Sequence, residues 1–300
     1  MTTPRLARPG EVSDILVRIR GSLPSLRPAE RRVAEAVLAD PAATAELSIS
    51  ALARQCATSE STVMRLCRSL GLDRFPEFRL ALARAATRAE TRHGDGVQLT
   101  GDISPTDTLA DIVAKIGFSD ARAIEDTTST LDLDALRGAA DAVARARRID
   151  IYGTGASGFV CLDLHQKLHR IGLFASAWLE PHAALTSAAL LTDQDVALGI
   201  SHTGTTIDTI EPLRLAGSRG ATTIAITNFG GSPITEGTGL VLTTAARETT
   251  FRSGATSSRI AQLAVVDCLF VAVAQQSYDR TVRAIENTFA AVHDRRYPSR

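Results

Sequence analysis

Four hydroxyl side chains lie within six residues, in the run SHTGTT at Ser201–Thr206. The apolar run Asp195–Ile200 before it predicts a buried strand, and the segment from Thr205 to about Arg219 predicts a helix. At such a turn the hydroxyls can donate hydrogen bonds to phosphate oxygens, and Gly204 lets the backbone approach an anion. The hydroxyls in question are those of Ser201, Thr203, Thr205 and Thr206. Hydroxyls also cap helices, so the pattern alone leaves both interpretations open.

A second turn of the same kind follows Arg148–Tyr152, in the sequence RIDIYGTGAS. The β-rich residues predict a strand, Gly153 and Gly155 predict a tight turn, and a helix is expected from about Gly158. A strand, a glycine turn and a helix N-terminus bring backbone N–H groups and partial positive charge together, which favours an anion. A lone Gly-x-Gly also occurs in many turns for steric reasons alone.

Two short helices with matched apolar stripes are predicted between Ser48 and Gly71. The stripes consist of Ile49, Leu52, Ala53 and Cys56, and of Val63, Leu66, Cys67 and Leu70. Ser48 and Ser59 are suited to cap these helices, and Gly71 to end the second. This is the pattern of a helix-turn-helix, whose second helix enters the major groove of DNA. The residues expected to face DNA are Ser59, Glu60, Ser61, Thr62, Arg65 and Arg68.

The charge distribution favours the same interpretation. Residues 1–90 contain 14 Arg against 10 Asp and Glu, whereas the whole chain balances 33 basic against 33 acidic residues. Arginine can bind the O6 and N7 atoms of guanine bidentately, and Ser or Thr can meet bases or phosphates. Further helices are predicted from Pro28 to Asp40 and around Pro76–Ala86. On the pattern alone, a helical bundle that serves only dimerisation remains the alternative.

The chain divides into a helical part and a part in which β-rich and helical runs alternate. We expect a DNA-binding domain at 10–90, a linker and an amphipathic connecting helix at 91–130, an α/β domain at 131–280, and a C-terminal helix and tail at 281–300. Further β-rich runs at Phe174–Leu179, Thr222–Thr227 and Leu240–Thr244 predict a doubly wound parallel sheet with helices on both faces. Ligands of such sheets bind beyond the carboxyl ends of the strands, where both loops lie.

Two resemblances extend these predictions. The run SISALARQCATSESTVMRLCRSLGLDRFPEFR resembles the DNA-binding domain of the RpiR family of regulators, over about Val12–Arg88. The later part resembles the sugar isomerase (SIS) domain over about Leu131–Gln276, on the runs YGTGAS, SHTGTT and Glu248–Phe270. The resemblances imply an all-α helix-turn-helix domain followed by an α/β SIS domain with a flavodoxin-like sheet. They also imply operator DNA and a phosphorylated sugar effector as partners.

The SIS resemblance implies roles for individual residues. In SIS domains the Ser/Thr-rich loop holds the phosphate, which assigns that role to the side chains of Ser201, Thr203 and Thr206 and to the amides of His202 and Gly204. Ser157 is expected at the sugar end. Glu248, Arg252 and Ser253 are expected to close over the sugar, although a surface loop fits them as well. The full expected effector set is Gly153, Gly155, Ser157, Ser201, His202, Thr203, Gly204, Thr206 and Glu248.

The sequence therefore predicts a cytoplasmic transcriptional regulator of carbohydrate metabolism whose operator binding is modulated by a sugar phosphate. A homodimer or homotetramer is expected, because one helix-turn-helix covers only a half-site. No cofactor, metal or catalytic residue is expected, since the four cysteines lack metal-ligand spacing. Neither a signal peptide nor a membrane span is predicted. The alternatives are a sugar-phosphate isomerase using Glu248, His182 or His202, and a sugar-binding scaffold without DNA function.

Overall fold

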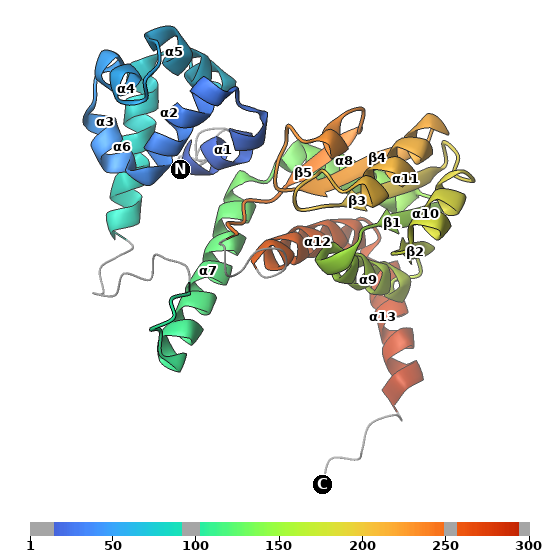
Figure 1. Cartoon of the computed structure of the whole chain (residues 1–300). Helices are drawn as coiled ribbons and strands as arrows, with labels where there is room; N and C mark the ends of the chain where they lie inside the picture. Colours follow the sequence, from blue (N-terminus) through green and yellow to red (C-terminus); the bar gives the residue numbers. More distant parts are fainter. Residues whose placement is uncertain (1–14, 92–102, 249–256, 294–300) are drawn as a thin grey trace, which may run out of the picture.

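The computed structural model describes residues 15–91, 103–248 and 257–293, which form two domains and a connecting helix (Figure 1). The N-terminal domain contains α1 (Ile15–Ser22), η1 (Leu23–Ser25), α2 (Pro28–Ala39), α3 (Pro41–Glu46), α4 (Ile49–Gln55), α5 (Glu60–Ser69) and α6 (Phe75–Thr91). The connecting helix is α7 (Leu109–Thr130). The α/β domain contains α8 (Leu133–Arg145), β1 (Arg148–Tyr152), α9 (Gly155–Arg170), β2 (Ala175–Trp178), α10 (Pro181–Ala188), β3 (Asp195–Ile200), α11 (Ile207–Ser218), β4 (Thr222–Thr227), η2 (Pro233–Thr235), β5 (Leu240–Thr243), α12 (Ser257–Gln276) and α13 (Tyr278–His293).

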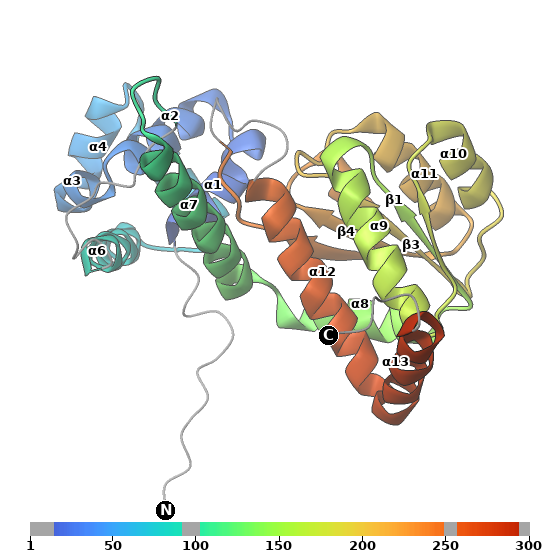
Figure 2. The ribbon, with the colours of Figure 1, turned by 90° about the horizontal axis from the view of Figure 1, so that it is seen from below.

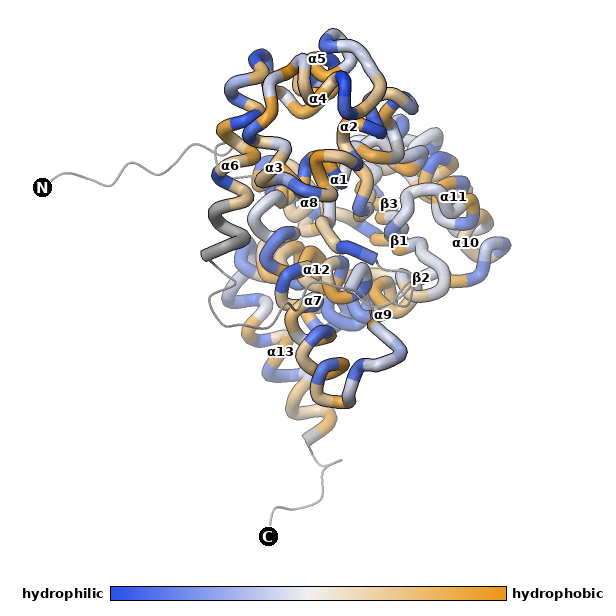
Figure 3. The backbone as a smooth tube through the Cα atoms, turned by 60° about the vertical axis from the view of Figure 1, so that its left-hand side comes forward, coloured by the Kyte–Doolittle hydropathy of each residue, from blue (hydrophilic) through white to orange (hydrophobic). Residues whose placement is uncertain are grey.

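The N-terminal domain is a helical bundle with a hydrophobic core of its own. α4 and α5 turn their predicted apolar stripes inward; α4 packs against α5, and α5 packs against α2. The fully buried side chains of this core include Ile19, Val33, Leu52, Val63, Leu66, Phe78 and Leu82. Figure 3 shows hydrophobic and hydrophilic residues alternating along these helices, as the 3.6-residue period requires. The helix-turn-helix pair is therefore held rigidly by the rest of the bundle.

The helix ends of this domain agree with the sequence prediction at two positions and differ at two others. The Ser48 hydroxyl accepts a hydrogen bond from Ala51 N and caps α4, and Gly71 ends α5 with φ +70°. Ser59 precedes α5 but makes no side-chain cap. Asp40 was expected only to end a helix, yet its carboxylate accepts from Ala43 N at 2.9 Å and begins α3. Asp40 thus separates α2 from α3, a helix that the sequence analysis did not predict.

The sheet of the second domain has five parallel strands in the order β2-β1-β3-β4-β5. This is the doubly wound, flavodoxin-like order that was predicted, with the winding reversing between β1 and β3. Ile151 of β1 lies opposite Leu198 of β3, and Leu198 lies opposite Ile224 of β4. All six residues of β3 are buried, as expected for a central strand covered on both faces.

Helices cover both faces of this sheet (Figures 1 and 2). On one face α8, α9 and α12 form the larger apolar cluster, which includes Leu164 and Val265. On the other face α10 and α11 form the smaller one, which includes Ala184 and Leu213. The layers position the loops that follow the strands, because α9, α10 and α11 begin directly after the loops that follow β1, β2 and β3.

α12 is the one helix within the described residues that is long and apolar enough to cross a membrane. Length and composition do not distinguish such a span from the core helix of a globular domain. Eight of its residues are buried, and Ala261, Val265 and Leu269 are fully so. It packs against α7, α8 and α9. In this structure α12 is therefore a core helix of the α/β domain.

Two apolar segments lie farther outside than their patterns suggested. The connecting helix α7 packs against α12, but Leu109 and Val113 on its apolar stripe are 82% and 72% exposed. Phe174, the first residue of the predicted β-rich run, is 66% exposed, and β2 begins one residue later. Phe159 on α9 is 64% exposed. These side chains form apolar surface that the described part of the chain leaves exposed.

Candidate functional site

A pocket lies beyond the carboxyl ends of β1 and β3, where the winding of the sheet reverses. Its volume is about 150 Å³. Its lining consists of Thr154, Ala156, Ser157, Ile200, Ser201, His202, Thr203, Thr206, Glu248, Ser258 and Gln262. The structure thus brings both predicted loops together, and six of the expected effector residues line one pocket. Those six are Ser157, Ser201, His202, Thr203, Thr206 and Glu248.

Two helix N-termini border this pocket. α9 begins after Thr154 and α11 begins after Thr206, and neither helix has a side-chain cap. The first amides of a helix have no partner within the helix, and its dipole places partial positive charge at that end. Two uncapped N-termini therefore face the same small space. An anion is the ligand that such an arrangement attracts.

Ser201 and Thr206 form the inner part of the hydroxyl loop. Ser201 is 3% exposed, and its Oγ lies 3.1 Å from Thr206 Oγ1. The same Oγ accepts a hydrogen bond from Gly204 N at 3.1 Å. Thr203 lies farther out, where its hydroxyl is 2.8 Å from that of Thr205. Ser201 and Thr206 are consequently the hydroxyls that lie deepest in this loop.

The three glycines of the expected effector set are not among the residues that line the pocket, and their conformations suggest a steric role. Gly204 has φ +65°, and a Cβ there would lie 1.9 Å from Ser232 Oγ. Its amide already donates to Ser201, so a phosphate is not its partner in this conformation. A Cβ at Gly153 would lie 2.6 Å from Cys161 Sγ, and Gly155 adopts φ +57°. These glycines shape the backbone around the site.

The opposite wall comes from the loop after β5 and from the start of α12. Glu248 accepts a hydrogen bond from the Ser258 hydroxyl. Ser157 Oγ and Gln262 exchange hydrogen bonds at 3.2 and 3.3 Å, and both residues are buried. Sequence reasoning missed Ser258 and Gln262. Their signal was a pair of polar residues four apart on a predominantly apolar helix, which places both on one face. The expected partners Arg252 and Ser253 lie outside the described residues.

Within the described residues, His202 and Glu248 are the two ionisable groups that line the pocket. The His202 Nε2 atom lies 3.8 Å from a Glu248 oxygen. Burial lowers the pKa of His202, and the nearby Glu248 carboxylate opposes this only in part. His202 is therefore neutral at pH 7, and its buried Nδ1 has no hydrogen-bond partner within the described part of the chain. Among the residues that the structure describes, no Lys or Arg lines this pocket.

The described residues contain no group of three or more His, Cys, Asp or Glu side chains able to hold a metal ion. Cys56, Cys67 and Cys161 are buried free thiols, and Cys268 is partly exposed. Of the groups proposed for isomerase chemistry, His182 is exposed at the start of α10 and does not line the pocket.

The predicted DNA-facing surface lies on α5, at the end of the N-terminal domain away from the sheet (Figure 1). Ser59, Glu60 and Ser61 are exposed at the start of this helix, and Arg65 and Arg68 are exposed farther along it. The Ser59 and Ser61 hydroxyls lie 2.8 Å apart. These side chains therefore share one surface, as the helical spacing predicted.

Thr62 departs from that prediction. It is 3% exposed, and its hydroxyl accepts a hydrogen bond from Arg65 Nη2 at 3.0 Å. Arg65 Nε also donates to Glu30 Oε1 of α2 at 2.9 Å. Because Thr62 faces the bundle, it orients the Arg65 guanidinium and is not placed to contact a base.

Comparison with known proteins identifies both domains. Residues 13–88 match the model of the helix-turn-helix domain of the rpiR family, and residues 142–272 match that of the SIS domain. An uncharacterized HTH-type transcriptional regulator of Caldanaerobacter subterraneus subsp. tengcongensis is 39% identical over 92% of this chain and 96% of the relative. The HTH-type transcriptional regulator RpiR of Escherichia coli is 30% identical over 88% and 87%. The two domains define a transcriptional regulator with a SIS domain. The chain belongs to the RpiR family.

A solved structure agrees with the arrangement along the whole chain. The NanR protein of Vibrio vulnificus, complexed with ManNAc-6P, matches with a TM-score of 0.60 and 28% identity. The match covers 94% of this chain and 100% of that one. The order of a helical DNA-binding fold and a SIS fold is therefore shared with a protein that was solved with a phosphorylated sugar.

Proposed function

We propose that this regulator binds operator DNA through α5 and that a phosphorylated sugar in the SIS pocket changes its affinity for that DNA. The observation that carries the proposal is the convergence of the uncapped N-termini of α9 and α11 with the hydroxyls of Ser201 and Thr206. Phosphate is strongly hydrated, so its burial requires several donors arranged in advance. NanR, which is similar over the whole chain, was solved with a phosphosugar and supports the ligand class.

The two walls of the pocket suit the two ends of such a ligand. The hydroxyl loop and the helix N-termini offer donors to the phosphate. Glu248 offers carboxylate oxygens, and Ser157 and Gln262 offer a hydroxyl and an amide, which suit the hydroxyls of a sugar. Thr203, exposed at the edge of the loop, adds a further donor, and the effector site comprises these residues with the His202 amide.

The second candidate function is isomerisation of the bound sugar phosphate. The observation that favours it is the His202–Glu248 pair, because proton transfer to and from a sugar needs a positioned acid and base. The helix-turn-helix domain favours the regulator. Incubation of the chain with hexose 6-phosphates, followed by chromatography of the sugars, distinguishes the two: the regulator leaves them unchanged.

We also propose that the regulator is a homodimer or homotetramer and acts in the cytoplasm, where its operator DNA lies. The apolar side chains of Phe159, Phe174 and Val113, all more than 60% exposed, are surface that a second copy of the chain can cover. Two copies also provide two recognition helices for a palindromic operator. Light scattering of the full chain tests this, and a monomer with and without sugar phosphate contradicts it.

Calorimetry tests the effector site. We expect N-acetylmannosamine 6-phosphate or glucose 6-phosphate to bind and the unphosphorylated sugars not to bind. Each hydroxyl lost in Ser201→Ala/Thr206→Val should cost about 1.5–3 kcal/mol of binding free energy, the range for hydrogen bonds to charged groups. Thr205→Val is the matched control, because Thr205 belongs to the same loop but does not line the pocket. Equal affinity for the phosphorylated and parent sugars contradicts the proposal.

A further inference from the structure

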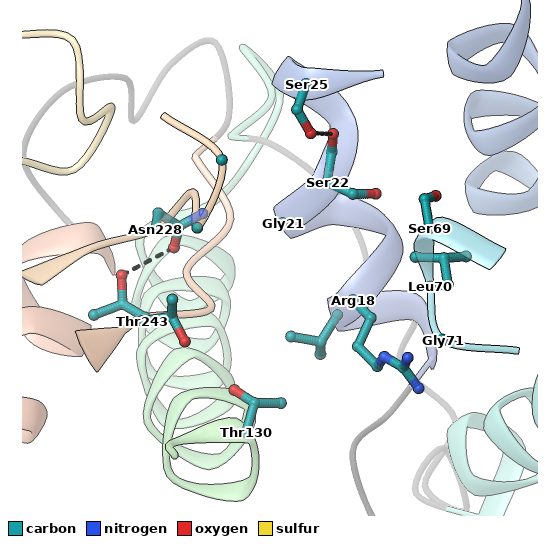
Figure 4. Close-up of a pocket in the computed structure, with 14 residues that line it drawn as sticks. Arg18, Gly21, Ser22, Ser25, Ser69, Leu70, Gly71, Thr130, Asn228 and Thr243 are labelled. Atoms are coloured by element: carbon teal, nitrogen blue, oxygen red, sulfur yellow. Dashed lines mark hydrogen bonds between the residues drawn. The ribbon is translucent and has the colours of Figure 1, made fainter. Parts of the chain in front are cut away.

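The loop after β4, residues Asn228–Gly231, lies against the DNA-binding domain. A Cβ placed on Gly231 would be 3.1 Å from Ser25 Cβ, and a Cβ on Gly21 would be 3.9 Å from the Asn228 carbonyl oxygen. Figure 4 shows α1 and η1 facing Asn228 and Thr243 across a cavity of about 600 Å³ that residues of both domains line. This loop is therefore a direct contact between the SIS domain and the first helices of the other domain.

The same loop is hydrogen-bonded to the hydroxyl loop of the effector pocket. Asn228 N donates to the His202 carbonyl at 3.0 Å, and Thr227 Oγ1 donates to it at 3.3 Å. The His202 and Phe229 rings lie 5.6 Å apart, edge to face. A shift of the His202 backbone when the pocket fills would therefore act directly on Asn228 and Phe229.

The side chain of Asn228 joins the opposite wall of the pocket to this contact. Its Oδ1 accepts hydrogen bonds from Thr244 Oγ1 at 3.1 Å and from Ala246 N at 2.8 Å. Ala246 precedes the pocket residue Glu248 by two positions. Asn228 is 6% exposed, so these bonds do not compete with bulk water. Asn228 thus holds both effector loops on one side and borders α1 on the other, while it is not among the residues that line the effector pocket.

We infer that Asn228 is a positioning residue that transmits effector occupancy to the DNA-binding domain, through the contact of Asn228–Gly231 with α1 and η1. The inference rests on the proposed function and specifies how that site regulates. A sugar phosphate that moves the His202 loop or the Glu248 loop toward itself changes the position of Asn228. The surface against which α1 packs then changes as well. The single short segment Asn228–Gly231 contacts the loops of the effector pocket as well as α1 and η1. Coupling of this kind changes affinity by about 5- to 150-fold.

The test compares Asn228→Ala with Asn287→Ala, a matched substitution on the exposed face of α13. Operator DNA is selected from a random pool by the full chain, and its affinity is measured by fluorescence anisotropy with and without N-acetylmannosamine 6-phosphate or glucose 6-phosphate. We expect Asn228→Ala to bind the sugar phosphate and the DNA each within about threefold of wild type, while the effect of the sugar on DNA affinity falls to less than about twofold. Asn287→Ala should keep the full response.

A second variant covers the case in which Asn228→Ala loses its fold. In Ser25→Cys/Gly231→Cys the two Cβ atoms are close enough for a disulfide after a small shift. The oxidised protein should bind sugar phosphate but keep one DNA affinity regardless of it, and reduction should restore the response. An oxidised protein, or a folded Asn228→Ala protein, that still responds fully overturns the inference. If calorimetry detects binding of neither sugar phosphate, the proposed function is contradicted, and the transmission through Asn228 that rests on it is contradicted too.

Discussion

Replacement of Gly204 by alanine tests whether steric contact, rather than ligand contact, makes glycine necessary in the hydroxyl loop. The φ of +65° costs an L-residue about 1–2 kcal/mol. The added Cβ would also lie 1.9 Å from Ser232 Oγ and 2.5 Å from Ser232 Cβ. Ser232 cannot easily yield, because it is buried and donates to the Phe229 carbonyl at 2.6 Å. Overpacking of this kind costs about 1–3 kcal/mol more.

Gly155→Ala is the matched control, since Gly155 has a similar φ of +57° and a Cβ there meets nothing within 4 Å. Urea unfolding of both variants can be followed by the fluorescence of Trp178, the single tryptophan, which lies on β2 and reports on the α/β domain alone. Gly204→Ala should lose about 2–5 kcal/mol and Gly155→Ala about 1–2 kcal/mol. Equal losses in the two variants would refute the steric explanation.

Three further predictions concern charged groups. Arg68→Ala should weaken binding to the selected operator DNA by about 1–3 kcal/mol and binding to scrambled DNA much less, as measured by anisotropy at fixed salt. Equal losses of binding free energy on both DNAs would mean that Arg68 contacts only phosphates. Burial raises the pKa of Asp195, but bonds from Arg147 and Thr192 outweigh this and hold the pKa below its usual range. Asp195→Asn should therefore cost about 1.5–3 kcal/mol near neutral pH, and that difference should vanish as pH falls below about 4; a pH-independent difference contradicts the ionic explanation. Because the pKa of His202 is lowered, the unfolded chain takes up its proton first, and stability should fall below about pH 6.5. His202→Gln should remove that part of the slope in urea titrations, and an unchanged slope assigns it to other groups.

The strands and the meeting of the two loops that follow β1 and β3 could be predicted from the sequence, because each depends on local pattern. β3 and β4 begin and end where their apolar runs predicted, and two loops at adjacent strand ends meet in any sheet of this order. α9 begins at Gly155, three residues before the predicted start, because the glycine turn itself forms the first turn of the helix. The start of α3 was missed for a related reason, since Asp40 serves two helices at once.

The features that could not be predicted from the sequence depend on contacts between distant segments of the chain. Gln262 reaches Ser157, 105 positions earlier in the chain, only because α12 packs across the sheet beside α9. Thr62 is buried because α5 packs against α2. The residue spacing on α5 alone does not show which residues at the edge of its exposed face a neighbouring helix covers. The steric need for glycine at position 204 could not be predicted, because an added Cβ would meet Ser232 only after both loops are placed.

The place of α12 in the chain has a consequence for synthesis. All five strands precede this helix in the sequence, so the ribosome releases the sheet before the helix that covers much of one of its faces. Until α12 docks, apolar side chains such as Val160 and Leu164 on α9 lack part of their final packing, and the helix itself is apolar enough to associate with membranes or chaperones. Chains cut short before Ser257 should therefore aggregate or be degraded in the cell, although they contain the complete sheet.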